Sequence, residues 1–276
     1  MIIICKHTNQ LCNRLFTYLP ILSYALEANE PVCFLFQYAK YDSYFPNIKK
    51  AGFKSCLQSK TLKPGVLATV FYSLIRGVDK VVHLVLKPGE SIPLRMPLGV
   101  LFGPKWREIR YDKGYVEKHR DELVKLFAPP AEVEEVIRKD VVGKEDVVTV
   151  GVHIRRGDYA SYRPELMFGM DVFKRYMERM ASLLSQEGRA VRFLICSDEN
   201  IDLAEFNGLN TFKMSKGGVL YDLYGLSACQ YIMGVPSTFS AWASFYGRVP
   251  MRYLMSANED IQLSDFKVCQ GLQKGV

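Results

Sequence analysis

The sequence contains no apolar run of the roughly 20 residues that a transmembrane helix needs. Residues 147–152 are typical of its apolar runs, which end well short of that length. At the amino terminus, residues 1–4 reach Lys6 too soon to form the apolar core of a signal peptide. We therefore expect a cytoplasmic protein.

The sequence motifs that hold common cofactors and metals are also absent. The chain has no Gly-x-Gly-x-x-Gly, no Gly-x-x-x-x-Gly-Lys and no His-Glu-x-x-His sequence. It has no Asp-x-Asp pair either, so paired aspartates cannot clamp a metal ion on a diphosphate. We predict no cofactor and no required metal, and we expect arginines and helix termini to bind any diphosphate instead.

The seven cysteines form no recognisable metal or disulfide framework. None of them stands in a Cys-x-x-Cys pair, and their odd number leaves one over. We expect most of them to be reduced, buried side chains that pack as small apolar residues.

The composition that is present indicates a globular protein. Hydrophobic residues make up 49% and charged residues 24% of the 276-residue chain, which suits one or two domains. The 36 Lys and Arg exceed the 29 Asp and Glu and give a formal charge of +7. This excess suits anionic ligands or docking on an acidic membrane surface, but it is too small to predict nucleic-acid binding. The oligomeric state is left open by these features.

The first part of the chain predicts a strand-helix-strand opening. Residues 2–5 form an apolar run, leucines then recur at helical spacing, and a second apolar run covers residues 32–36. Pro20 falls inside this helix, where we expect it to kink the helix or force a later start. Prolines and glycines interrupt residues 87–105, which we predict to be mostly loop and a candidate acceptor-site or lid region.

The second part predicts an α/β fold with a parallel sheet. Residues 147–154 are β-branched and almost continuously apolar, which is typical of a strand covered on both faces. Apolar side chains then share one helical face over residues 170–184. Further elements alternate between strand and helix, as an α/β sheet requires: strands at 191–196, 211–214 and 231–235, and helices near 200, from 219 and after 238. We place a domain boundary between residues 145 and 146.

Residues 153–159 (His-Ile-Arg-Arg-Gly-Asp-Tyr) stand at the end of the predicted buried strand, where ligands bind in open α/β sheets. Strand alternation puts His153 and Arg155 on one face and Arg156 on the other, unless the chain turns at Arg156. Two arginines, a histidine and a carboxylate suit recognition of a phosphate group. The alternative is a solvated strand end that carries an Arg–Asp salt bridge.

Residues 237–242 (Ser-Thr-Phe-Ser-Ala-Trp) lie at a second strand-to-helix junction. Their hydroxyl groups can cap the helix, and the exposed amides and helix dipole can also hold an anion. On this pattern alone, capping is the better interpretation. Asp198 lies at another strand end, and Asp222 lies near a helix start, where an aspartate usually interacts with the dipole.

Taken together, these motifs resemble the bacterial α-1,2-fucosyltransferases of glycosyltransferase family 11. The resemblance covers residues 147–246 and rests on residues 153–159, 197–199, 222–224, Ser227, Cys229 and 237–242, in that order. Residues 10–16 lie where such enzymes carry a Gly-x-Gly-Asn-Gln-x-Phe loop. Asn13 and Phe16 match that loop, whereas its glycines and glutamine are replaced by Gln10, Cys12 and Arg14.

The resemblance implies a GT-B fold, in which two Rossmann-like domains face each other across a cleft. Residues 1–145 would form the acceptor-side domain, with Asn13 and Arg14 on the acceptor side. Residues 146–276 would bind the donor, GDP-fucose, without a required metal. The implied reaction is an inverting transfer of L-fucose to a glycan acceptor, with α-1,2 linkage as the leading assignment.

The resemblance also implies roles for individual residues. Arg155 would contact the β-phosphate and stabilise the leaving group. The other donor-side assignments are His153 and Asp222 toward the guanosine, Ser237, Thr238 and Ser240 along the diphosphate, and Arg156 and Asp198 as neighbours. We rank Asp158 above Glu165 as the general base, although easy departure of the leaving group can make a strong base unnecessary.

Two other functions remain open at this stage. The first is a related transferase that uses another nucleotide sugar, because residues 10–16 depart from the pattern. The second is a sugar-nucleotide or glycan-binding protein that has lost catalysis.

Overall fold

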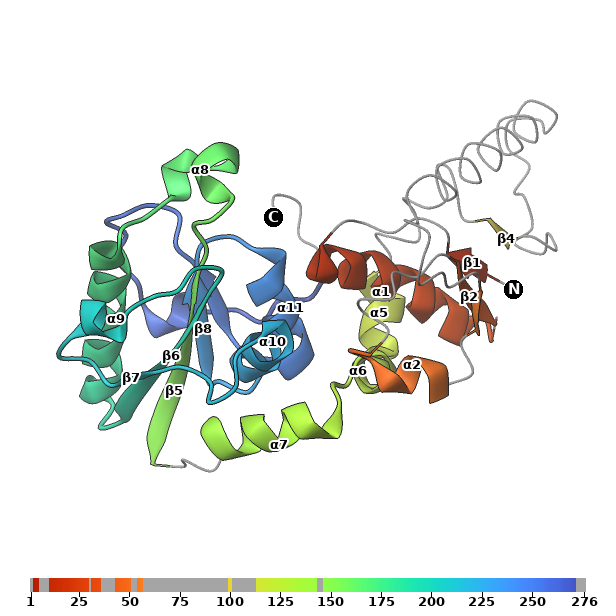
Figure 1. Cartoon of the computed structure of the whole chain (residues 1–276), viewed down its shortest axis with the longest axis horizontal. Helices are drawn as coiled ribbons and strands as arrows, with labels where there is room; N and C mark the ends of the chain where they lie inside the picture. Colours follow the sequence, from red (N-terminus) through yellow and green to blue (C-terminus); the bar gives the residue numbers. More distant parts are fainter. Residues whose placement is uncertain are drawn as a thin grey trace. The chain divides into compact units, whose positions relative to one another are not determined.

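A computed structural model describes residues 2–4, 10–29, 31–35, 43–50, 54–56, 99–100, 113–142 and 146–271. The chain divides into two compact units, Met1–Pro130 and Ala131–Val276 (Figure 1). Of the loop predicted over residues 87–105, only the short strand Gly99–Val100 falls among the described residues. The rest of that prediction lies outside them.

The first unit contains a parallel four-stranded sheet with the strand order β3-β2-β1-β4. Helix α1 lies between β1 and β2 along the chain, which confirms the predicted strand-helix-strand opening. Helices α5 and α6 both pack against α1. The elements of this unit are β1 (Ile2–Ile4), α1 (Leu11–Glu27), β2 (Val32–Leu35), α2 (Pro46–Lys50), β3 (Lys54–Cys56), β4 (Gly99–Val100), α5 (Lys113–Lys118) and α6 (Arg120–Leu126).

Helix α1 runs through Pro20 instead of starting after it. The prediction of a later start is therefore wrong, because the helix already begins at Leu11. Proline removes one backbone hydrogen bond from a helix interior. Burial of the apolar face offsets that loss, since Leu15, Leu19 and Leu22 are almost fully buried.

The second unit contains a parallel five-stranded sheet with the order β7-β6-β5-β8-β9. Strand β5 is the first of the five along the chain, and it lies between β6 and β8. The strand order therefore reverses direction beside β5, which makes a topological switch point at that edge of the sheet. The strands are β5 (Val147–Ile154), β6 (Ala190–Ser197), β7 (Thr211–Phe212), β8 (Tyr231–Gly234) and β9 (Met251–Tyr253).

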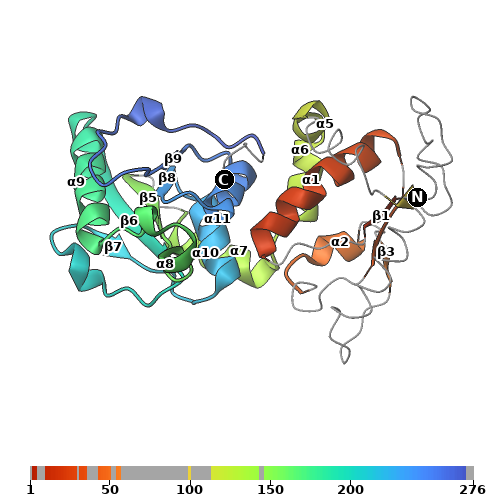
Figure 2. The same ribbon diagram turned by 90° about the horizontal axis from the view of Figure 1, so that it is seen from above.

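Helices cover both faces of this sheet, which confirms the predicted α/β class. Helix α9 lies on one face, and α10 and α11 lie together on the other (Figures 1 and 2). Helix α7 packs against α10, and this compact unit begins with α7 at Ala131, whereas the sequence places the domain boundary between residues 145 and 146. The helices are α7 (Ala131–Asp140), α8 (Tyr159–Tyr162), α9 (Met170–Gln186), α10 (Val219–Ser227) and α11 (Thr238–Gly247), with short 3-10 turns at Pro164–Leu166, Leu203–Phe206 and Leu263–Asp265.

The core of the second unit follows the predicted pattern. Every residue of β5 after Val147 is buried, as expected for a strand covered on both faces. On α9, Phe173, Met177 and Met180 are fully buried in the same hydrophobic core as the β5 side chains. Fully burying a side chain of this size contributes roughly 1.5–3 kcal/mol. The side chains of the described cysteines Cys12, Cys196, Cys229 and Cys269 are buried. Within the described segments, no helix combines the length and apolar character needed to cross a membrane.

Gly234 ends β8 at a point where no side chain fits. It pairs in register with His153 of β5, and a Cβ atom on Gly234 would stand 2.2 Å from the His153 carbonyl oxygen. We expect Gly234→Ala to lower the free energy of unfolding by about 2–3 kcal/mol, because the strand must shift to relieve the overlap. Urea denaturation would measure this change.

Gly217→Ala is the matched control, since a Cβ atom there would meet nothing within 4 Å. It should change stability far less than Gly234→Ala. Equal midpoints for the two variants would contradict the close approach of β8 and β5.

Candidate functional site

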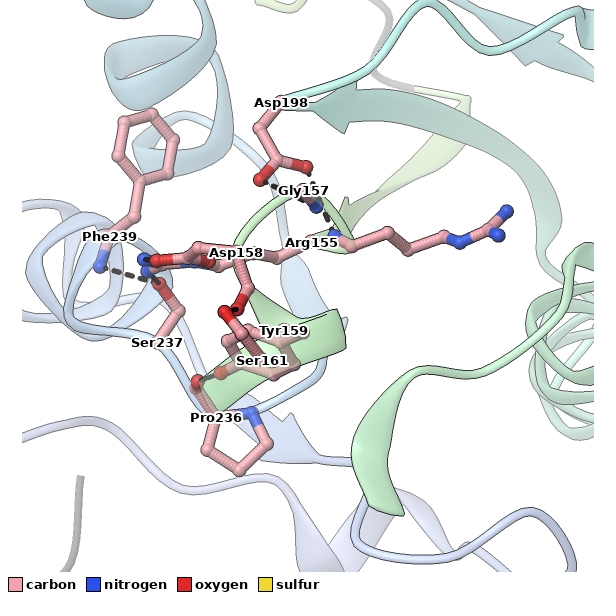
Figure 3. A network of polar contacts seen from close by, with 10 residues as sticks. Arg155, Gly157, Asp158, Tyr159, Ser161, Asp198, Pro236, Ser237 and Phe239 are labelled. Carbon is pink, nitrogen blue, oxygen red and sulfur yellow. Dashed lines mark hydrogen bonds and ion pairs between the residues drawn. The ribbon is translucent and has the colours of Figure 1, made fainter. Parts of the chain in front are cut away.

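The ends of β5 and β8 bring together two motifs that are far apart in the sequence. His153 of β5 is level with Gly234 of β8, so the segments that follow both strands emerge side by side. Arg155 and Ser237, which are 82 residues apart, are joined by a hydrogen bond of 3.1 Å from Nη1 to Oγ (Figure 3). The predicted strand end and the predicted helix cap therefore form a single site at the switch point.

The Arg155 guanidinium is held by several contacts at once. Its Nε and Nη2 donate to Asp158 Oδ1 and Oδ2 at 2.9 and 2.6 Å. The ring of Tyr159 lies 5.4 Å from the Arg155 Cζ atom. The hydrogen bonds that Arg155 donates to Asp158 raise the pKa of Arg155, so the side chain stays charged. The Arg–Asp salt bridge of the alternative interpretation thus exists, and it lies at the position where parallel sheets bind ligands.

Asp198 fixes the turn that follows β5. Its Oδ1 and Oδ2 accept the backbone N–H groups of Arg156 and Gly157 at 3.1 and 3.2 Å. A Cβ atom on Gly157 would be 3.0 Å from Asp198 Oδ2, so glycine suits this close contact. The Arg156 side chain approaches Glu199 instead, with Nε 3.9 Å from Oε2. Asp198 therefore acts on the backbone of the motif and holds its shape.

His153 is buried beside this turn. Its side chain is 6% exposed, and its ring lies 5.1 Å from the Phe239 ring at an interplanar angle of 31°. Burial, followed by the charge of Arg155, lowers the pKa of His153 to about 4. The imidazole is therefore neutral at pH 7, with one nitrogen that donates and one that accepts. The buried Nδ1 atom has no hydrogen-bond partner among the described residues.

Ser237 caps helix α11, as the sequence predicts. Its Oγ accepts the Phe239 N–H at 3.2 Å. Ser240 is buried, and its hydroxyl donates to the Ser237 carbonyl at 3.1 Å, so that proton is already used within the first turn. Thr238 is half-buried at the first residue of the helix. The N–H groups in the first turn of this helix supply a partial positive charge next to Arg155.

Asp222 lies in the first turn of α10, as expected for a residue near a helix start. Its backbone carbonyl is 3.8 Å from the Sγ atom of Cys196, a residue of β6. Burial raises the pKa of Asp222 to about 6. A buried carboxylate has lost part of its hydration, so it has fewer hydrogen bonds to water. A ligand with two N–H donors would replace those hydrogen bonds.

The predicted acceptor-side residues belong to the first unit. Asn13 is half-buried and Arg14 is buried in the first turn of α1, and the Arg14 backbone N–H donates to the Gln10 carbonyl at 3.0 Å. Residues 11–16, which align with the loop of the resembled family, are therefore helical. Glu165, the second base candidate, is exposed in the turn Pro164–Leu166.

Three residues of the site escaped the sequence analysis. Tyr159 donates its hydroxyl hydrogen to the Pro236 carbonyl, and Tyr253 donates to the Ser237 carbonyl at 3.2 Å. Phe239 packs on His153. Tyr159 and Phe239 lie inside the motifs but resemble core residues, whereas no motif signals Tyr253.

A family comparison decides which proteins this chain belongs with. The family model for glycosyl transferase family 11 matches residues 109–266, more than half of the chain. The chain belongs to glycosyl transferase family 11. The match contains β5, β8 and every donor-side residue named above, and within the described residues no group of three or more His, Cys, Asp or Glu side chains is placed to hold a metal ion.

Galactoside alpha-(1,2)-fucosyltransferases match part of the chain at low identity. The galactoside alpha-(1,2)-fucosyltransferase 2 of Pongo pygmaeus is 26% identical over 137 residues, which is 46% of this chain and 40% of the relative. The enzyme of the same name from Sus scrofa is 27% identical over 111 residues, 38% of this chain and 33% of the relative. The matches thus span less than half the length of these relatives.

Solved structures of fucosyltransferases share the fold. The NodZ alpha-1,6-fucosyltransferase co-crystallized with GDP has a TM-score of 0.52 and 14% identity, covering 91% of this chain and 93% of that chain. FUT1 of Arabidopsis thaliana, in complex with GDP, has a TM-score of 0.52 and 12% identity, covering 96% and 72%. At this identity the likeness shows a common α/β architecture with parallel sheets.

Proposed function

We propose that this chain is a fucosyltransferase that moves L-fucose from GDP-fucose to a hydroxyl group of a glycan acceptor, in α-1,2 linkage and with inversion. The observation that carries the proposal is the Arg155 guanidinium, held between Asp158 and Ser237 at the switch point of the sheet. Membership of family 11 supports the reaction class. The names of the sequence relatives support the linkage, and the GDP-bound structural neighbours support the donor.

The donor diphosphate would lie against Arg155 and the start of α11. An arginine binds phosphate oxygens through two parallel hydrogen bonds, and a helix amino terminus adds its own N–H groups. Ser237 and Thr238 stand at that terminus, while Ser240 acts from within the cap. His153 and Asp222 would face the guanosine.

Transfer with inversion requires the acceptor hydroxyl to attack fucose C1 from the face opposite GDP. The C1–O bond to the β-phosphate breaks, its electron pair passes to GDP, and a new C1–O bond forms to the acceptor. Negative charge grows on the diphosphate as this happens, and Arg155 is positioned to stabilise it.

The acceptor proton needs a destination in this scheme. Both carboxylate oxygens of Asp158 bind Arg155 in the structure, so Asp158 can accept a proton only after the diphosphate has taken its place on the guanidinium. Donor binding would thereby release the base. Glu165 is the alternative base, and early departure of GDP would make a strong base unnecessary.

The proposed division of labour follows a GT-B enzyme, with two Rossmann-like domains across a cleft. Residues 146–276 would bind the donor, and residues 1–145, with Asn13 and Arg14, would meet the acceptor. We further propose that the protein works in the cytoplasm, where its net charge of +7 would favour peripheral docking on an acidic membrane.

A donor-by-acceptor transfer assay, with product linkage determined by NMR, tests this function. GDP-fucose should be the preferred donor, and the product should carry an α-1,2-linked fucose on the glycan. Transfer from a different nucleotide sugar would favour the related transferase. Binding of GDP without hydrolysis or transfer of any donor would favour a binding protein that has lost catalysis.

Activity should persist in EDTA. Arg155 and the start of α11 supply the positive charge that a metal ion supplies in enzymes with paired aspartates. The measurement is the initial rate of transfer with EDTA and after adding back Mg²⁺ or Mn²⁺. A faster rate with the ion would be consistent with help in GDP release. Activity that vanishes in EDTA and returns with the ion would contradict this view of the leaving group.

A further inference from the structure

Two tyrosine hydroxyl groups hold the turn between β8 and α11. The Tyr159 hydroxyl donates to the Pro236 carbonyl, and the Tyr253 hydroxyl donates to the Ser237 carbonyl at 3.2 Å. Tyr159 is the last residue of the motif at 153–159 and begins α8, and Tyr253 ends β9. The turn is therefore fixed from two separate elements, through consecutive peptide groups.

The Ser237 carbonyl oxygen accepts three hydrogen bonds. Besides Tyr253, it accepts the Ser240 hydroxyl at 3.1 Å and the Ala241 N–H at 3.0 Å. Two of these three donors come from α11 itself, and only Tyr253 ties the carbonyl to the sheet. Burial raises the pKa of Tyr253, so its hydroxyl keeps the proton that it donates.

Fixing this peptide group also fixes the Ser237 side chain. Its Oγ accepts both the Phe239 N–H and Arg155 Nη1. Tyr159 adds a second constraint, because its ring lies against the Arg155 guanidinium while its hydroxyl holds the turn. Arg155 is therefore connected to the turn in two ways, directly through Ser237 and indirectly through Tyr159.

We propose that Tyr159 and Tyr253 are positioning residues for the donor diphosphate. Their hydroxyl groups hold the β8–α11 turn in the conformation that binds the diphosphate before the nucleotide arrives. Because Ser237 belongs to this turn and contacts Arg155, the turn also holds the Arg155 guanidinium in place. Such preorganisation increases affinity, because the entropy lost in ordering the site is lost on folding and not on binding. The inference rests on the proposed function, since it takes the ligand to be GDP or its sugar conjugate.

The test compares three single Tyr→Phe variants that each remove one hydroxyl group. Tyr159→Phe and Tyr253→Phe remove the two positioning contacts and keep both rings. Tyr176→Phe is the control, because its hydroxyl also donates to a backbone carbonyl, that of Ser256 at 2.7 Å, and accepts the Glu259 N–H at 3.0 Å, but joins α9 to the segment after β9. Calorimetric titration with GDP and thermal melting are measured for all three variants and the wild type.

Tyr159→Phe and Tyr253→Phe should each weaken GDP binding by about fivefold or more, which is the effect of losing one net hydrogen bond. In steady-state kinetics the KM for the donor should rise, while the KM for the acceptor stays unchanged. Tyr176→Phe should lower the melting temperature at least as much, because its hydroxyl makes two hydrogen bonds to the backbone, and it should leave GDP affinity at the wild-type value.

Wild-type GDP affinity in both site variants would overturn the inference while leaving the proposed function intact. An equal loss of affinity in Tyr176→Phe would also overturn it, because the effect would then follow stability alone. A wild-type protein that does not bind GDP would instead refute the donor assignment itself. The three results are distinguishable in one series of titrations.

Discussion

Arg155→Ala should lower the rate of fucosyl transfer more than 100-fold and leave the protein folded. Removing one preorganised donor to a developing oxyanion typically costs about 3–4 kcal/mol of transition-state stabilisation. The fold should survive, because Asp158, the carboxylate that pairs with Arg155, is 46% exposed and can be hydrated when its partner is removed. Turnover with saturating donor and the melting temperature are the two measurements.

Arg175→Ala provides the control for this experiment. Arg175 also pairs with an aspartate, Asp171, at 2.8 Å, but both side chains are exposed on α9. This variant should keep full activity. Arg155→Lys should recover little activity, since an ammonium group cannot reproduce the bidentate geometry. Near-normal turnover in Arg155→Ala at an unchanged melting temperature would remove Arg155 from the mechanism.

Asp222→Asn should weaken GDP binding about tenfold and at the same time stabilise the fold at neutral pH. A carboxylate can accept hydrogen bonds from both guanine N1 and the exocyclic amine, each strengthened by its charge, whereas an amide offers one acceptor. The stabilisation follows from burial, which raises the pKa of Asp222 from 3.8 to about 6. Calorimetry and urea denaturation of the same variant measure the two effects.

The sign of the pH dependence can be worked out from that shift. The folded protein binds the Asp222 proton more tightly than the unfolded chain, so the ionised group destabilises the fold above pH 6. This cost, on the order of 3 kcal/mol, is relieved as the pH falls from about 6 toward 4. GDP affinity should change in the opposite direction and decrease as the carboxylate becomes protonated.

Nucleotide selectivity supplies the control for Asp222. Adenine lacks the adjacent N–H donors of guanine, so the wild type should prefer GDP over ADP by about tenfold or more, and Asp222→Asn should lose most of that preference. Asp171→Asn, on the exposed face of α9, should change neither nucleotide affinity. Equal wild-type affinity for GDP and ADP would refute the guanine assignment.

The second unit was more predictable from sequence than the first because its patterns are stronger. The continuous apolar run of β5 predicts a strand buried on both faces, and the single apolar face of α9 predicts a helix buried on one side. Both elements appear where predicted. Helix α1 was harder to delimit, because the penalty at Pro20 is local while the burial that offsets it depends on the rest of the unit.

The site was predictable to the level of its motifs, but not to the level of its contacts. Residues 153–159 and 237–242 lie at strand ends, which sequence periodicity can locate. The hydrogen bond from Tyr253 to the Ser237 carbonyl depends on the pairing of β9 with β8, and that register follows from tertiary packing. Asp198 likewise binds backbone N–H groups 41 and 42 residues away in the sequence. A local sequence pattern cannot predict a contact at that separation.

The separation of Arg155 and Ser237 by 82 residues also bears on how the protein is synthesised. The ribosome releases the arginine half of the site long before the serine half exists, because chains emerge from the amino terminus. During that interval β5 can pair with β6, while the edge that later binds β8 keeps its N–H and C=O groups unpaired. A chain interrupted after α10 would retain this open edge and would lack the phosphate site, so incomplete chains should aggregate and should not be rescued by nucleotide.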